Sequence, residues 1–254
     1  MSLKALIPCL FLATGSIMAA ERSFEKVFDV EPQSSFSLDN HKGHIQVRTD
    51  NVAVIQVNAR IYFEEEGADE SLLDHVNIRT RSSGNSVSVD VDYDDDHRNF
   101  SGLLGKNQSW PAVDFDIVLP DDANLRIESH KGSFDVVAPA GRVAIESHKG
   151  HGILSNIRSD FKLSTHKGEF KVEILKLADL SVETHKGDVT VSIHDAVNFR
   201  IRAETHKGNF SFTGREIPMK WNDGRPWVSY SAGDGSNFID LETHKGRIAL
   251  EFLN

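Results

Sequence analysis

The chain has 254 residues, 39% of them hydrophobic, and a formal net charge of −10 at pH 7. That length suits one folded domain, and the acidic balance argues against general nucleic-acid binding, which depends on Lys and Arg neutralising phosphates. The one cysteine is Cys9, so a chain that loses its first residues has no disulfide and must be held by its core or by repetition.

Residues 1–20 have the order of a secretory signal peptide. Lys4 precedes an apolar run that ends at Ala13, and small residues continue to Ala20. The run is too short to span a bilayer, which takes roughly 20 apolar residues. We therefore predict cleavage after Ala20, export to the periplasm, the cell surface or the medium, and a mature domain over 21–254 without a transmembrane span.

Residues 36–129 are predicted to form irregular N-terminal coils. Alternating apolar residues at 53–63, 87–91 and 113–119 indicate β-strands, because the side chains of a strand point to opposite faces in turn. The segment from Glu64 to Asp74 is expected to hold a short helix.

A tripeptide repeat organises the rest of the chain. From residue 130 onward, successive His-Lys-Gly copies are 18, 18, 19, 21 and 38 residues apart, and the last step equals two periods. The copies are His41-Lys42-Gly43, His130-Lys131-Gly132, His148-Lys149-Gly150, His166-Lys167-Gly168, His185-Lys186-Gly187, His206-Lys207-Gly208 and His244-Lys245-Gly246. A fixed period of this length is typical of repeat architectures.

The residues around each copy alternate between apolar and polar, as in Leu180-Ser181-Val182 before one copy and Val189-Thr190-Val191 after it. Each coil therefore carries at least two half-buried strands, and stacking the coils closes a shared core. We predict an all-β, single-stranded parallel β-solenoid (β-helix) with coils of about 18–21 residues. The regular coils would span 125–212, with an insertion or cap at 213–237 and the last coil at 238–254. Each glycine would turn a corner that only glycine fits.

This layout is similar to the putative adhesin family of bacterial exported β-solenoid proteins. The segments that carry the resemblance are Phe36–Val47, Val118–Pro120, Leu180–Val189 and Asn237–Ile248. The resemblance implies a β-solenoid over nearly all of the mature chain, and surface attachment by analogy. Family members often have a small polar residue before the glycine, so the His-Lys pairs are a departure from the family pattern.

Three polar rows are expected to run along the outside of the solenoid, because residues i and i+2 of a strand share a face. The first contains Glu128, Glu146, Glu183, Glu204 and Glu242. The second contains His130, His148, His166, His185, His206 and His244. The third contains Lys131, Lys149, Lys167, Lys186, Lys207 and Lys245. The Ser or Thr just before each histidine is expected to face the core.

These rows allow three interpretations. They can form a self-neutralising outer face without a ligand, since opposite charges in neighbouring rows attract. The imidazoles and carboxylates can bind Zn, Cu or Ni between coils. The Lys and His rows can also present a polyanion- or glycan-binding face, which would depend on pH because His titrates near pH 6.5. A glycan loop containing Trp221, Trp227 and Tyr230 is a weaker candidate than an end cap.

The function that these patterns favour is an adhesin-like binding or scaffold protein of the cell envelope, not an enzyme. A solenoid enzyme that acts on polysaccharides needs one unique cluster of catalytic groups, whereas here the polar residues repeat. The partner would be an envelope polymer, a glycan or a protein. The pattern names neither that ligand nor the oligomeric state.

Overall fold

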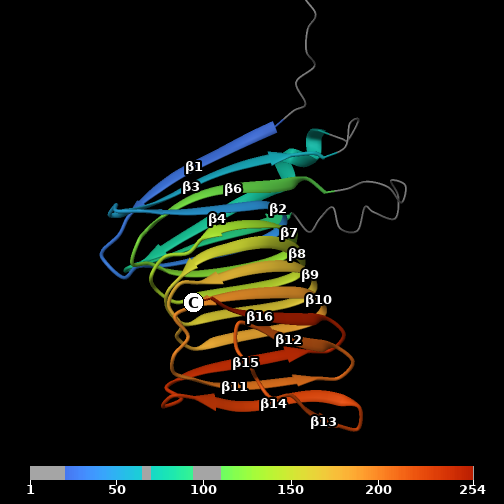
Figure 1. Cartoon of the computed structure of the whole chain (residues 1–254). Helices are drawn as coiled ribbons and strands as arrows, with labels where there is room; N and C mark the ends of the chain where they lie inside the picture. Colours follow the sequence, from blue (N-terminus) through green and yellow to red (C-terminus); the bar gives the residue numbers. More distant parts are fainter. Residues whose placement is uncertain (1–20, 65–69, 94–109, 254) are drawn as a thin grey trace, which may run out of the picture.

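The computed structural model describes residues 21–64, 70–93 and 110–253, so the predicted signal segment lies outside the described residues. In the described part the chain is all-β, apart from the short 3-10 helix η1 (Glu70–His75), which overlaps the predicted helix. The strands form one elongated stack (Figure 1). No helix in this part is long and apolar enough to cross a membrane.

The strands, in chain order, are β1 (Glu21–Asp29), β2 (Ser35–Asp50), β3 (Val54–Tyr62), β4 (Val76–Ser83), β5 (Ser86–Tyr93), β6 (Ala112–Pro120), β7 (Asn124–Val137), β8 (Val143–Ile157), β9 (Phe161–Ile174), β10 (Leu180–His194), β11 (Phe199–Thr205), β12 (Asn209–Thr213), β13 (Lys220–Asn222), β14 (Arg225–Ala232), β15 (Asn237–Thr243) and β16 (Arg247–Leu253).

The centre of the molecule is a stack of five long parallel strands, in the spatial order β2, β7, β8, β9 and β10. Each carries one His-Lys-Gly copy near its middle, and neighbouring strands pair in register before and after that copy. Leu125 pairs with Val143, for example, and Val143 pairs with Phe161. For these five strands the predicted parallel stacking of equivalent residues is confirmed.

The prediction of a purely parallel solenoid is wrong at both ends of the stack. At one end, β5 and β6 each pair in parallel with one half of β2, and β4, β3 and β1 then add in antiparallel fashion. At the other end, β14 pairs antiparallel with β11, and β13 pairs antiparallel with β14. The physical reason is that a strand at the end of a stack has an unpaired backbone edge, which these short antiparallel strands cover.

The strands at the C-terminal end do not stack in the order of the sequence. The last pair, β15 and β16, lies between β10 on one side and β11 with β12 on the other. The final copy, at His244, therefore lies between the copies at His185 and His206 in space. Segment 213–237 contains β13 and β14, which cap the stack beyond β11 (Figure 1).

The core runs the length of the stack and is built from the alternating apolar side chains. Val182 and Leu241 are almost fully buried, whereas Glu183 and Glu242 beside them are exposed, as predicted. The Ser/Thr row before the histidines is also buried, at Ser129, Ser147, Thr165, Thr184 and Thr243. Thr243 Oγ1 accepts a hydrogen bond of 2.9 Å from the backbone N–H of Gly246, which braces the corner of that coil.

The glycine of each copy is required by close backbone approach. Gly168 and Gly187 have φ angles of 145° and 144°, which residues with a side chain rarely adopt. A Cβ on either residue would lie inside contact distance of the backbone carbonyl of the glycine on the preceding coil. The predicted requirement for glycine is therefore confirmed at these positions.

We expect Gly168→Ala to lower the free energy of unfolding by more than about 2 kcal/mol, toward the upper part of the range for single substitutions. The matched control is Gly84→Ala, because Gly84 also has a positive φ, of 56°, but has no atom within 4 Å of the added Cβ. Urea unfolding of both variants measures the difference. Equal losses would show that the crowding between glycines does not matter.

We also expect Val182→Asp to prevent folding or to destabilise it severely, because a charge would enter the stacked apolar layer without a partner. Glu183→Gln, one residue further along the same strand, should cost only a few tenths of a kcal/mol. Circular dichroism during thermal unfolding distinguishes the two. A larger effect at Glu183 would mean that the faces of β10 are assigned the wrong way round.

Candidate functional site

The seven His-Lys-Gly copies bring seven imidazole rings into one continuous stack. The rings are nearly parallel, with interplanar angles of 2–7°. Centroid separations are 5.0 Å for His41–His130, 4.7 Å for His130–His148, 4.8 Å for His148–His166, 4.5 Å for His166–His185, 4.5 Å for His185–His244 and 4.8 Å for His244–His206. This row of stacked rings, called the histidine stack below, follows from the register of the strands.

Stacking decides which ring form is stable. The pKa values of His148, His166, His185 and His244 are all lower than that of a free histidine. Burial is the larger cause, and the positive charges of neighbouring His and Lys side chains are the smaller one. The Nδ1 atoms of His166, His185 and His244 are buried and have no hydrogen-bond partner among the described residues. A protonated Nδ1 would be a buried donor without an acceptor, so this geometry favours the neutral ring.

The first end of the histidine stack is closed by aromatic residues that the sequence did not single out. Tyr93 meets His41 edge-on at 5.4 Å, and Trp110 meets Tyr93 edge-on at 5.5 Å. Burial raises the pKa of Tyr93, and its hydroxyl donates a 3.1 Å hydrogen bond to the carbonyl of Pro111. The contact of Tyr93 with the histidine stack is hard to predict from the sequence, because Tyr93 lies in an acidic segment and not in one of the repeats.

The carboxylate row lies beside the histidine stack, in register along the strands. Asp39 pairs with Glu128, Glu128 with Glu146, and Glu183 with Glu242. Burial and the charge of Glu128 raise the pKa of Asp39. Glu128 is bound by Arg126, its neighbour on the same face. No ion pair joins this row to the repeat lysines among the described residues, so the predicted mutual neutralisation does not take the form of direct contacts.

The lysine row follows the corner of the stack. Lys42 is held at 2.6 Å by Glu64. The other six are exposed and have no carboxylate within ion-pair distance among the described residues: Lys131, Lys149, Lys167, Lys186, Lys245 and Lys207. A groove of about 700 Å³ runs along the first part of this row, lined by Lys42, Lys131, Lys149 and Lys167 together with His44, His151 and Glu169.

The described residues contain no preformed site for the predicted metal ion. In the residues that the structure describes, no group of three or more His, Cys, Asp or Glu side chains is arranged to hold a metal ion. The lone pairs of stacked rings lie in parallel planes, so neighbouring imidazoles do not converge on one ion, as zinc ligands must. Zn or Cu binding by the His and Glu rows stays a prediction.

The three aromatic residues of the predicted glycan loop do not share one surface. Trp221 on β13 is 64% exposed, whereas Trp227 and Tyr230 on β14 are half-buried. Trp227 and Tyr230 are three positions apart in one strand, so they point to opposite faces. Lys220 lies over the Trp227 ring at 4.8 Å from its centroid.

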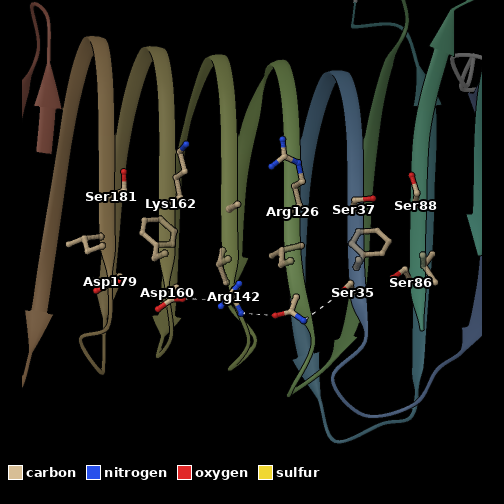
Figure 2. Close-up of a pocket in the computed structure, with 18 of the residues that line it drawn as sticks. Ser35, Ser37, Ser86, Ser88, Arg126, Arg142, Asp160, Lys162, Asp179 and Ser181 are labelled. Atoms are coloured by element: carbon tan, nitrogen blue, oxygen red, sulfur yellow. Dashed lines mark hydrogen bonds and ion pairs between the residues drawn. The ribbon is translucent and has the colours of Figure 1, made fainter. Parts of the chain in front are cut away.

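A second groove, which the sequence analysis did not predict, lies on the outer face of the strand halves that precede the tripeptides. It has a volume of about 920 Å³ and reaches from β4 and β5 across β2, β7, β8, β9 and β10 to β15. Figure 2 shows its polar side chains, including Ser37, Arg142, Asp160 and Ser181, on successive strands. Its outward residues differ from coil to coil, as at Arg126, Ala144, Lys162 and Ser181, so no fixed motif in the sequence marks the groove.

The lowered histidine pKa values predict a loss of stability in mild acid. The unfolded chain takes up protons near pH 6.5, before the folded stack does, so the free energy of unfolding falls as pH drops below about 7. Between pH 7.5 and 5.5 the melting temperature should fall less when His148, His166, His185 and His244 are all changed to Gln. An equal or steeper fall in the variant would contradict the effect.

Comparisons with known proteins support the fold. No curated protein sequence matches the chain. A crystal structure of a putative cell adhesion protein from Clostridium sporogenes aligns with a TM-score of 0.52 and 14% identity, covering 91% of this chain and all of that one. A putative adhesin from Bacteroides fragilis aligns with a TM-score of 0.38 and 9% identity, covering 94% of this chain and all of that one, which is too distant to support an argument. Residues 137–251, the part that holds most of the repeats, match the model of the Toastrack DUF4097 family.

Proposed function

We propose that this chain is an exported, non-enzymatic binding module of the cell envelope that holds an extended anionic polymer along its lysine row. The observation that supports this best is the lysine row itself. Six lysines stand in register on successive coils, exposed and without carboxylate partners among the described residues. An adhesin-like character agrees with the similar fold of the putative cell adhesion protein from Clostridium sporogenes.

Repulsion between the lysine charges destabilises the folded chain unless an anionic ligand binds to the lysine row. Equivalent lysines on neighbouring strands lie about 4.8 Å apart in the pairing direction, and like charges directly opposite each other destabilise a sheet. The glycine alone is enough to turn the corner, so folding does not demand a lysine before it. A polymer with regularly spaced carboxylates or phosphates would relieve the repulsion along the whole row at once.

The surroundings of the row suit a long ligand. The groove beside Lys131, Lys149 and Lys167 is open and runs along the axis of the stack. Burial lowers the pKa of four rings in the neighbouring histidine stack, so these rings favour their neutral form and the attraction comes from the lysines. The repeated arrangement offers many equivalent contacts and no unique catalytic cluster, which fits binding better than polysaccharide cleavage.

The test compares two triple variants of the mature chain that remove the same charge. Lys149, Lys167 and Lys186 changed to Gln should weaken binding to polygalacturonate at least tenfold, measured by calorimetry at low salt. Lys171, Lys176 and Lys220 changed to Gln remove three lysines outside the row and should change binding by less than about twofold. In the parent, binding should weaken with added salt.

Two results would contradict the proposal. Equal losses in the two triple variants would mean that polygalacturonate responds only to overall charge. Absence of binding to polygalacturonate and to polyphosphate by the folded parent chain would remove the anionic polymer as ligand.

A further inference from the structure

The groove in Figure 2 differs in chemistry from the lysine groove. Five serines contribute hydroxyl groups to the groove: Ser35, Ser37, Ser86, Ser88 and Ser181. Small side chains such as that of Ala144 lie between longer side chains. Hydroxyls both donate and accept hydrogen bonds. These side chains border a shallow trough that crosses the strands, so it follows the axis of the stack.

Most charged side chains in this groove, though not Lys162 and Asp179, are paired with a side chain of opposite charge. Arg142 Nε lies 3.3 Å from a carboxylate oxygen of Asp160, and Arg126 is bound to Glu128. At the far end, Arg202 Nε donates a 3.0 Å hydrogen bond to Asp240. Among the cations that line the groove, Lys162 has no carboxylate partner in the described part of the chain. A strongly charged polymer would gain little here, whereas an uncharged ligand rich in hydroxyls would meet matching groups.

The polar groups near the middle of the groove are fixed in position. Asn124 Oδ1 accepts a 3.0 Å hydrogen bond from the backbone N–H of Arg142, and Asn124 Nδ2 lies 3.4 Å from Ser35 Oγ. Figure 2 shows this chain of contacts running from Ser35 through to Asp160. Groups held in this way lose little conformational freedom when a ligand binds.

From these features we infer that the groove is a binding site for an uncharged linear polysaccharide strand. The strands recur about every 4.8 Å along the stack, which is close to the length of one sugar in an extended chain, so successive sugars would meet successive coils. The serine hydroxyls and the planar Arg142–Asp160 pair would bind sugar hydroxyls. Ala144 and the half-buried Phe238 would face the apolar sides of the rings. This site is separate from the lysine row and does not depend on it.

The test uses cellohexaose, chitohexaose and maltohexaose as probes of the folded mature chain. At least one of them should bind, and binding should be insensitive to salt. Ala144→Glu places a charged side chain in the middle of the groove and should weaken that binding at least tenfold. Ser181→Glu, two coils further along the groove, should also weaken oligosaccharide binding, because one oligosaccharide chain would span both positions.

Thr190→Glu is the matched control, because Thr190 is half-buried and points outward from β10 beyond the tripeptide. It should leave oligosaccharide binding unchanged, as should the triple Gln variant of Lys149, Lys167 and Lys186. Absence of binding to all three probes would overturn the inference. So would equal weakening by Thr190→Glu and Ala144→Glu, or loss of polygalacturonate binding on Ala144→Glu with no effect on a neutral probe.

Discussion

The structure depends on how closely the glycine corners of adjacent coils approach. Parallel strands in exact register place each residue beside its equivalent, and the contact of Gly187 with the carbonyl of Gly168 leaves no room for a side chain. Once the glycines are aligned, the preceding His and Lys of every copy must align as well. The histidine stack and the lysine row are therefore two consequences of one backbone contact, although only one of them is favourable by itself.

The histidine stack and the lysine row have opposite effects on the stability of the fold. Flat neutral rings can stack at the strand spacing and shield one another from water, whereas ammonium groups at the same spacing repel. Burial and the neighbouring His and Lys charges lower the pKa of four of these imidazoles, so protonating these four rings is unfavourable. A chain selected only for stability would keep the rings and replace the lysines, which is why the lysines are the better guide to a ligand.

Much of the central stack could be predicted from the amino-acid sequence, because alternation assigns Val182 to the core and the tripeptide fixes the register. The ends could not be, since no repeat marks the antiparallel strands that cover the open edges. The spatial order of the last copies was also hidden, because the copies at His206 and His244 are interchangeable as patterns. The outer groove escaped prediction because it is formed by small residues, such as Ser37 and Ala144, that differ from coil to coil.

The position of β15 and β16 has a consequence for how the chain reaches its final form. These strands fill the gap between β10 and the unit of β11, β12 and β14. During synthesis, β11 and β12 emerge before the strands β15 and β16 with which they pair. The backbone hydrogen-bonding groups along one edge of β10 and one edge of that unit therefore stay unpaired until residues 237–253 are in place. Residues 237–253 therefore join two parts of the stack that, in the described part of the chain, have no other strand pairing with each other.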